Sequence, residues 1–295
     1  MLSCSIINRR IIINPASGED WFDLSGIESF NENLTISNGP DLTTIKLPNL
    51  KLIDTFELVN LPKLQNLDIS ALQSAGSLRL QGLPSLLAVS SLSTIQVAEP
   101  GTGYDTSGGI RIISTGLQEI DFLETEGVVG DATVTNISIT DNPALAKVDI
   151  KGMTMGNADV VITNNGGDQG TSIMLSDAKR LGNINITSAK TLFVPNLATV
   201  AGSLDIRESL AQTLDFPALS TIGGNFIVAN NPQLSSLKYD HVTQIGNIPV
   251  NDPQSPNRSG MFIVGDNPKL QSIALRSNEV FQVGSGILLQ GPFSR

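Results

Sequence analysis

The sequence predicts a mostly-β protein: a right-handed β-solenoid of about eleven coils, with parallel strands and leucine-rich-repeat character. Three observations support this fold. An apolar–x–apolar triplet recurs along nearly the whole chain of 295 residues. Aromatic residues make up only 4% of the sequence, which favours many thin stacked layers over a core of large rings. The repeated units contain no clear helical stretch, so their remaining edges are predicted to be short strands and turns.

The spacing of the triplets defines the repeat. Successive triplets begin 22, 22, 32, 27, 23, 24, 20, 22, 36 and 25 residues apart. Coils of 20 to 25 residues match leucine-rich repeats in length, although the L-x-x-L-x-L-x-x-N signature is not met cleanly. The eleven triplets begin at Leu34, Phe56, Leu78, Ile110, Ile137, Val160, Ile184, Leu204, Phe226, Phe262 and Ile287.

Each triplet is predicted to be a short strand followed by a corner. In a strand, the first and third residues of the triplet face the core and the middle one faces outward. Asn, Asp or Gly follows two residues after the clearest triplets, and proline follows two positions later, which predicts a sharp turn. The pairs are Asn38 and Pro40, Asn60 and Pro62, Gly82 and Pro84, Asp141 and Pro143, Asn230 and Pro232, and Asp266 and Pro268.

A second motif marks the next edge of the coil. It reads "LPNL" from Leu47, "VPNL" from Val194 and "FPAL" from Phe216. A single unit of this size cannot bury its own apolar side chains, whereas neighbours stacked on both sides can. The core is therefore expected to run continuously through the stack of coils.

The repeats divide the chain into three segments. Residues 1–30 are predicted to form an N-terminal cap, residues 31–291 the repeat solenoid, and residues 292–295 a tail. The solenoid admits a division into two halves, with insertions near 96–109 and 246–260. In the cap, Ser17 and Asp20 resemble a helix capping box. Trp21, Phe22 and Leu24 are expected either to plug the first coil or to be core residues of a distorted coil.

The two ends of the chain lack targeting signals. Arg9 and Arg10 interrupt the apolar part of "MLSCSIINRRIIINPASGED", which disfavours a secretory signal, and "GILLQGPFSR" does not fit a lipid-anchor signal. "GSGILLQG" aligns with "GGNFIVAN", so 287–289 is expected to be the strand of a new coil with no polar cap after it. This pattern suggests a fragment or a truncated gene product.

Composition limits the partners. The net charge of -10 and the pI near 4.5 argue against nucleic acid or anionic lipid. The sequence has no run of 18 apolar residues, so no membrane span is expected.

The sequence offers few groups for catalysis or metal binding. Cys4 and His241 are the only residues of their kinds, which makes Ser-His-Asp, Cys-His, zinc and copper sites improbable. "NNGGDQG" from Asn164 imitates a phosphate or calcium loop but holds one carboxylate, so a plain corner is favoured. No cofactor, metal or catalytic residue is predicted.

The main enzymatic alternative is a polysaccharide lyase or hydrolase on a parallel β-helix, which needs acidic groups converging from successive coils. The outward column has no two acids on adjacent coils, and Glu57 beside Arg79 is expected to be an ion pair. Ile227 and Ile263 make its C-terminal part apolar, which fits a missing segment, a partner chain or simple strand preference. The column reads Thr35, Glu57, Arg79, Arg111, Ser138, Val161, Asn185, Asp205, Ile227 and Ile263.

Surface modification and sugar contact are further expectations. Four candidate N-glycosylation sequons begin at Asn33, Asn136, Asn185 and Asn257, a number that chance alone would give in this composition. Asn257 lies in a predicted loop and is the best acceptor. In the other insertion, Tyr104 with Asp105 is a candidate sugar contact, with a solvated loop as the alternative.

Taken together, "LDFPALSTIGGNFIVANNPQLSSL" and the other strand–Asn–Pro–x–Leu units resemble the receptor L-domain-like repeats of fungal cell-wall-organisation proteins. These are the GPI-anchored extracellular-mutant and sporulation-specific group. The resemblance covers roughly residues 30 to 290 and implies an extracellular glycoprotein at the cell surface or wall, without known catalysis. The signal peptide, Ser-rich stalk and anchor signal of the family are not visible in this sequence.

Two functions follow from the sequence. The first is a non-catalytic wall or surface protein whose solenoid binds cell-wall glycan or another surface protein. The second is a carbohydrate-active β-helix enzyme. The outward column favours the first.

Overall fold

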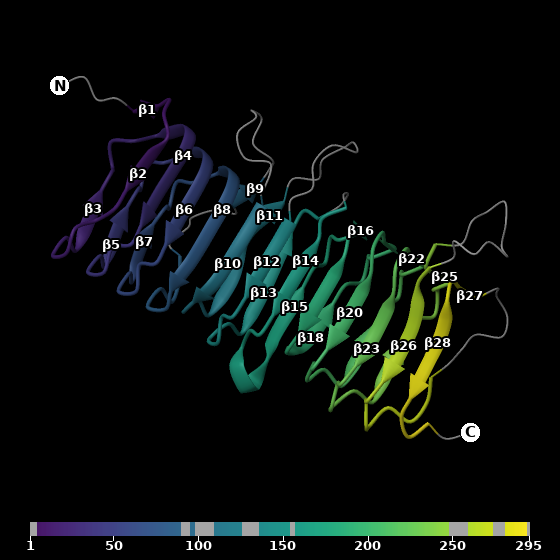
Figure 1. Cartoon of the computed structure of the whole chain (residues 1–295). Helices are drawn as coiled ribbons and strands as arrows, with labels where there is room; N and C mark the ends of the chain where they lie inside the picture. The colour runs from purple at the N-terminus through teal and green to yellow at the C-terminus, as the bar shows by residue number, and fades with distance from the viewer. Residues whose placement is uncertain are drawn as a thin grey trace. The chain divides into compact units, whose positions relative to one another are not determined.

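A computed structural model describes residues 5–89, 95–97, 109–125, 136–153, 157–247, 259–273 and 281–293. These residues form parallel strands of a β-solenoid of about ten turns, with a single short 3-10 turn, η1 (Gly167–Gln169), which confirms the predicted fold class (Figure 1). The chain divides into two compact units. Unit 1 comprises residues 1–126, 133–150 and 164–167, and unit 2 comprises residues 127–132, 151–163 and 168–295.

Unit 1 is built from coils with strands on three sides. On the first side lies a ladder of parallel strands, and the N-terminal parts of β4, β6 and β8 bend onto the second side, where they pair with β1 and β9. The first-side strands are β2 (Ile11–Ile13), β4 (Ser29–Ser37), β6 (Leu52–Val59), β8 (Ser74–Leu83), β10 (Gly109–Thr115) and β12 (Asn136–Thr140). The second side adds β1 (Ile6–Ile7), β9 (Ile95–Val97), β11 (Glu119–Thr125) and β13 (Lys147–Lys151). The third side is a separate sheet of β3 (Trp21–Asp23), β5 (Thr44–Lys46) and β7 (Asn66–Asp68).

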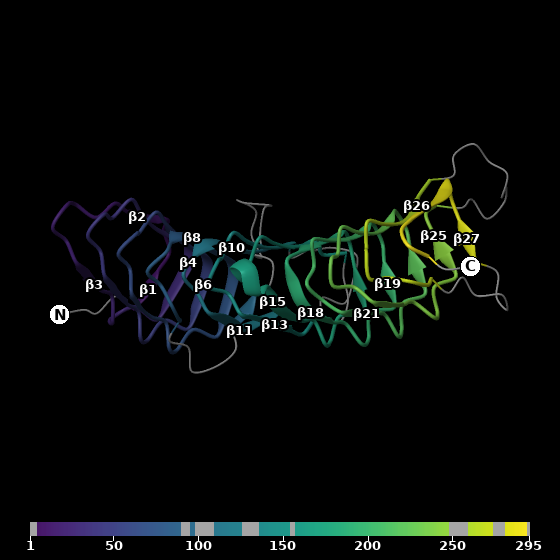
Figure 2. The same ribbon diagram turned by 90° about the horizontal axis from the view of Figure 1, so that it is seen from below.

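Unit 2 repeats this plan with shorter strands (Figure 2). Its long ladder consists of β14 (Val160–Thr163), β17 (Ile184–Thr187), β20 (Leu204–Arg207), β23 (Phe226–Ala229), β26 (Met261–Gly265) and β28 (Gly286–Gln290). A second sheet contains β16 (Arg180–Leu181), β19 (Thr199–Val200), β22 (Thr221–Ile222), β25 (Gln244–Ile245) and β27 (Gln282–Val283). The remaining strands are β15 (Thr171–Met174), β18 (Ala189–Phe193), β21 (Thr213–Asp215) and β24 (Ser236–Lys238).

The inward positions of the triplets form the core, as predicted. In β4 the flanking residues Leu34 and Ile36 are fully buried, while the middle residue is partly exposed. Unit 2 differs from unit 1 because five of its aromatic rings form a cluster, with neighbouring ring centroids 5.4 to 6.0 Å apart. The rings belong to Phe216, Phe226, Tyr239, Phe262 and Phe281.

The corner after each strand has the same backbone geometry in both units. The residue predicted to turn the chain adopts a left-handed conformation, with φ of 59° at Asn38 and 58° at Asn230. Asn, Asp and Gly tolerate this region best, which explains their recurrence. In the weaker repeats the same position is held by Ser114, Ser188 and Glu208, also with positive φ.

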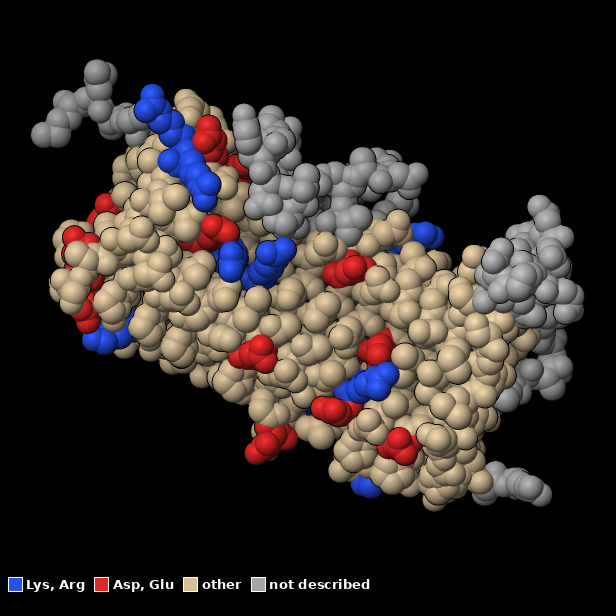
Figure 3. All heavy atoms as spheres, viewed as in Figure 1, with Lys and Arg blue, Asp and Glu red and all other residues tan. Residues whose placement is uncertain are grey.

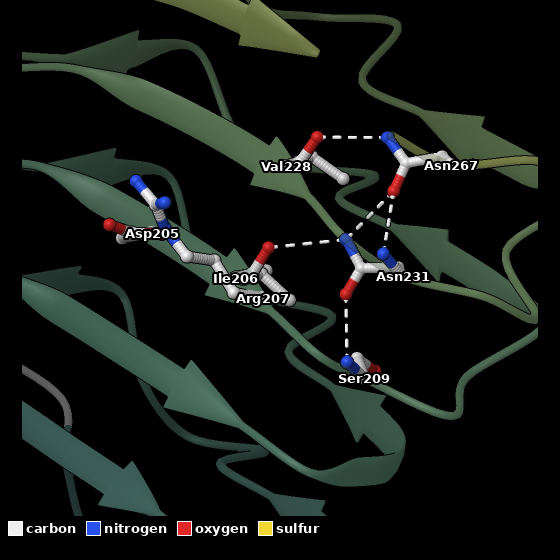
Figure 4. Close-up of polar contacts among 7 residues, drawn as sticks. All are labelled: Asp205, Ile206, Arg207, Ser209, Val228, Asn231 and Asn267. Carbon is white, nitrogen blue, oxygen red and sulfur yellow. Dashed lines mark hydrogen bonds and ion pairs between the residues drawn. The ribbon is translucent and has the colours of Figure 1, made fainter. Parts of the chain in front are cut away.

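The residue after the corner forms buried asparagine ladders, which the sequence did not predict. Asn231 and Asn267 in unit 2 are fully buried. The side-chain oxygen of Asn267 accepts hydrogen bonds from the backbone and side-chain nitrogens of Asn231 at 3.0 and 3.1 Å, and the side-chain oxygen of Asn231 accepts one from the backbone of Ser209 at 2.9 Å (Figure 4). Their amide groups also donate to the strand carbonyls of Ile206 and Val228.

Unit 1 contains an equivalent ladder. Asn142 donates to the side-chain oxygen of Asn165, and its own side-chain oxygen accepts from the backbone and hydroxyl of Thr115. The segment "NNGGDQG" is therefore a corner, as predicted, and Asn165 belongs to its buried part. These side chains satisfy backbone groups where the coil changes direction, and buried polar groups without such partners are strongly unfavourable.

The two expectations about the N-terminal segment are wrong in part. The structure has no helix at Ser17, whose hydroxyl instead donates to Asp41 at 3.1 Å. Trp21 neither plugs a coil nor belongs to a core, because 62% of its surface is exposed. At the other end of the described residues, the side chains of Ile287, Leu288 and Leu289 in β28 are exposed.

Candidate binding surfaces on the outer strand faces

The outward column of unit 1 forms one continuous row across neighbouring strands. The strand register places Thr35 beside Glu57, Glu57 beside Arg79, and Arg79 beside Arg111, as the repeat spacing predicts. The Thr35 hydroxyl donates to Glu57 at 2.9 Å, and the Arg79 guanidinium lies 3.6 Å from the other oxygen of that carboxylate. Arg79 also donates to the side-chain oxygen of Gln81. The carboxylate is therefore held between two partners.

Arg111 extends this row beyond the ion pair. Its side chain is exposed, and it has no ion-pair partner among the residues that the structure describes. Basic groups lie over β10 on this face (Figure 3). The row is therefore polar and locally basic in a protein that is acidic as a whole.

The outward column of unit 2 changes character along the strands. Asn185 lies beside Asp205, Asp205 beside Ile227, Ile227 beside Ile263, and Ile263 beside Leu288. The exposed fraction is 9% for Ile227 and 40% for Leu288. After Val161, which lies beside Asn185, the column thus passes from polar groups to an apolar row whose exposure is greatest on β28.

The polar part of this column contains an ion pair within a single strand. The Arg207 guanidinium donates to Asp205 at 2.7 Å (Figure 4). This hydrogen bond raises the pKa of Arg207 above its ordinary value. Because the Asp205 carboxylate is bound to the Arg207 guanidinium, it is poorly suited to act as a base or nucleophile.

The described residues show no constellation typical of a hydrolase or lyase on either column. No two acids are adjacent in these rows, and the described part of the chain holds no group of three or more potential metal ligands. His241 is exposed. Two acidic residues of unit 1 that lie outside these columns influence each other. Burial, followed by the charge of Glu32, raises the pKa of Asp54.

Three of the candidate glycosylation sites fall on described strands. Asn185 is exposed in the middle of β17 and Asn136 is exposed at the start of β12, whereas Asn33 is partly buried beside a register shift in β4. Asn257, Tyr104 and Asp105 lie outside the described residues, so their predicted roles stay predictions.

The third side of unit 1 carries a feature that sequence reasoning missed. Phe22 faces inward and aligns with the buried residues Ile45 and Leu67, so Trp21 must face outward beside Thr44. Asn66 continues this row on β7, and its amide donates to the Thr44 hydroxyl at 3.4 Å. Period-two alternation in "DWFDL" was the signal available in the sequence.

A second row of polar groups runs parallel to the first. It consists of Asp23, Lys46 and Asp68 on the same three strands. The hydroxyl and backbone amide of Ser25 donate to Asp23 and lower the pKa of that carboxyl. Asp23 is therefore a fixed, ionised acceptor beside Trp21.

Comparison with known proteins shows that the chain is similar to several fungal proteins. The chain is 27% identical over 238 residues to the cell wall protein ecm33 of Schizosaccharomyces pombe, which covers 80% of the chain and 52% of that protein. It is 24% identical over 273 residues to sporulation-specific protein 22 of Saccharomyces cerevisiae, covering 92% of the chain and 52% of that protein. It is 23% identical over 234 residues to the cell surface GPI-anchored protein ECM33 of Candida albicans, covering 79% and 52%.

The chain spans about half the length of the curated relatives it matches. No family model and no solved structure matches it. Within the described residues, the structure contains no helix with the length and apolar character needed to cross a membrane. Over most of its length, the chain is therefore similar to fungal Ecm33 and sporulation-specific proteins, the group that its repeats resemble.

Proposed function

We propose that this chain is a non-catalytic module of a fungal cell-wall protein, which presents its outer strand faces to wall glycan or to another surface protein. The observation that carries this proposal is the outward column itself. Its register is regular over several coils. Glu57 and Asp205 are each held in an ion pair with an arginine, and the other positions are amides, hydroxyls, aliphatic groups and the exposed Arg111. Such a surface is suited to binding and offers no converging acids.

The relatives support an extracellular location. Those described above include a cell wall protein and a cell surface protein, so we infer that this chain also acts at the cell surface or in the wall. Attachment to a lipid anchor is part of the same proposal, because one of the relatives is a GPI-anchored protein. Glycosylation at Asn136 or Asn185 is also part of it, because both asparagines are exposed on the strand face.

A carbohydrate-active enzyme remains the second candidate, and one observation favours it. Asp54, in β6, has a raised pKa and lies near Glu32, in β4. A carboxyl with a raised pKa near a second carboxyl group is the arrangement used in glycoside hydrolysis. However, Glu32 and Asp54 do not belong to the outward column of unit 1, and the outward column of unit 2 contains no pair of adjacent acids.

The two candidates are separated by measuring binding and turnover together. The purified chain is incubated with insoluble β-glucan, chitin and mannan, and both its sedimentation with each polysaccharide and the soluble products are measured. We expect the protein to sediment with at least one polysaccharide and to release neither reducing sugar nor unsaturated ends. Product release that disappears in the Glu32→Gln, Asp54→Asn double variant would overturn the non-catalytic proposal.

A further inference from the structure

We propose that Trp21, with Thr44, Asn66 and Asp23, forms a stacking platform for a neutral hexopyranose chain on the third side of unit 1. This inference rests on the proposed glycan-binding function and names a site for it. Tyr104, the aromatic candidate of the first insertion, is not involved, because the platform belongs to the short strands β3, β5 and β7.

The orientation of Trp21 is the first part of the argument. The side chain is 62% exposed and stands on the outward side of a regular strand, while its neighbour Phe22 points inward. An indole face held on a strand provides a flat, apolar surface with few internal degrees of freedom. Trp binds well where one side of a partner is apolar and its edges are polar, and a pyranose ring has this character.

The surroundings of the ring are the second part. The next two positions in the row are Thr44 and Asn66, both polar, so the indole does not belong to an apolar patch of the kind that covers a protein–protein interface. Adjacent strands are separated by about 4.8 Å, which places the backbones of Thr44 and Asn66 about 5 and 10 Å along the row, and the Asn66 amide reaches back to the Thr44 hydroxyl. A sugar stacked on Trp21 would therefore meet these groups with its own hydroxyls and those of the next sugar.

Charge is the third part, and it selects the class of sugar. Beside the ring stands the ionised Asp23, and the second row holds two carboxylates against the single ammonium of Lys46. Figure 3 shows acidic groups gathered at the end of unit 1 that carries β3. Carboxylates accept hydrogen bonds from sugar hydroxyls but repel phosphate and uronate groups. The platform is accordingly suited to uncharged hexopyranoses.

The chain contains a single tryptophan, so its fluorescence reports on this site alone. The purified protein is titrated with uncharged β-1,3-gluco-, chito- and manno-oligosaccharides, and with a phosphorylated manno-oligosaccharide. We expect at least one uncharged oligosaccharide to shift the emission to shorter wavelength and to protect the indole from quenching by acrylamide. The phosphorylated sugar is expected to produce no change.

Matched variants test whether the ring itself binds. Trp21→Ala is expected to weaken sedimentation with the preferred polysaccharide about fivefold or more, and Asn66→Ala to weaken it less. Phe193→Ala is the control, because Phe193 is a comparably exposed aromatic residue on β18 in unit 2, 51% exposed, and its loss should leave binding unchanged. Far-ultraviolet circular dichroism confirms that each variant is folded.

The outcomes distinguish the platform from the broader proposal. If polysaccharide sediments the protein while the Trp21 emission and the Trp21→Ala affinity are unaffected, the platform is overturned and the glycan-binding function stands. A response to the phosphorylated sugar alone overturns the assignment of an uncharged ligand. If no polysaccharide binds at all, the glycan-binding function fails together with its site.

Discussion

The two units present different outer surfaces on the same coil geometry. In unit 1 the outward column holds Thr35, Glu57 and Arg79 in a connected polar row. In unit 2 the corresponding column passes from Asp205 to Ile227 and Ile263 and becomes apolar. Both units nevertheless place a left-handed residue at the corner after most of the first-side strands, and both contain a buried asparagine ladder.

This difference shows which positions the fold constrains. Inward side chains and corners must repeat, because each coil buries its apolar groups against the next and turns the chain at the same point. Outward positions meet solvent or a ligand and are free to vary from coil to coil. Functional specificity in this protein is therefore expected on the outer faces, and the interior is expected to respond to mutation alike in both units except where aromatic rings gather.

The largest effect is expected in the interior of unit 2. Phe262→Ala should lower the free energy of unfolding by about 4 kcal/mol, because it leaves a cavity and removes ring contacts to three aromatic neighbours. Phe56→Ala in unit 1 should cost about 1 kcal/mol less, since Phe56 is equally buried but has no ring contact among the described residues. Chemical denaturation measures both. Equal losses would show that the aromatic cluster adds nothing beyond burial.

The next effect concerns the asparagine ladders. Asn231→Ala should lower the free energy of unfolding by about 3 kcal/mol, because it leaves the Ser209 amide, the Ile206 carbonyl and the Asn267 side chain without their partner. Asn230→Gly is the control at the adjacent exposed corner and should change stability by less than about 0.5 kcal/mol. Asn142→Ala in unit 1 should match Asn231→Ala. A small effect in either unit would mean that water replaces the ladder there.

A smaller effect with the opposite sign is expected at the corners. Glu208 adopts a φ of 51°, which is unfavourable for a residue with a Cβ atom. Glu208→Gly should therefore stabilise unit 2 by about 0.5 kcal/mol, the balance of relieved strain and the greater freedom of glycine when unfolded. Asn38→Gly in unit 1 should be nearly neutral, because asparagine already tolerates the conformation. The thermal midpoints of the two variants test this contrast.

The smallest effects are expected from the acids of unit 1, and their pH dependence has opposite signs. The hydrogen bond from Lys63, supported by those from Gly18 and Ser17, lowers the pKa of Asp41 to about 2 from 3.8. Its stabilising contribution is complete above pH 3.8 and is lost as the pH falls toward about 2. Asp41→Asn should therefore lower the thermal midpoint near neutral pH and flatten its decline in acid.

Asp54 should behave in the reverse way. Burial and the charge of Glu32 raise its pKa, so its protonated form is favoured in the folded protein. The contribution of Asp54 is present below the ordinary pKa and is lost as the pH rises through the raised value. The thermal midpoint of Asp54→Asn, measured relative to that of the wild-type protein, should therefore be higher at neutral pH than at pH 3. A parallel shift at all pH values would exclude titration as the cause.

The sequence alone determined the repeat, the alternation of inward and outward residues, and the corners. Period-two triplets and Asn-Pro spacing are local signals, and local sterics decide strand direction and left-handed turns. For this reason the predicted column from Thr35 to Arg111 agrees with the strand register. The same repeats predicted a resemblance to fungal cell-wall and sporulation-specific proteins, and the similar proteins found by comparison belong to that group.

Only the tertiary structure decided which polar groups meet between coils. Asn231 has the sequence pattern of a turn residue, yet it is buried. The Asn267 side chain, the strand carbonyl of Ile206 and the corner amide of Ser209, which are distant along the chain, surround it. The Trp21 ring was expected either to plug the first coil or to lie in the core of a distorted coil. It lies outside because the inward place on β3 is taken by Phe22, which stacks in register with Ile45 and Leu67. The repeat spacing predicts the register between coils, but the hydrogen-bond partners that a side chain finds in a neighbouring coil are long-range contacts that no local pattern specifies.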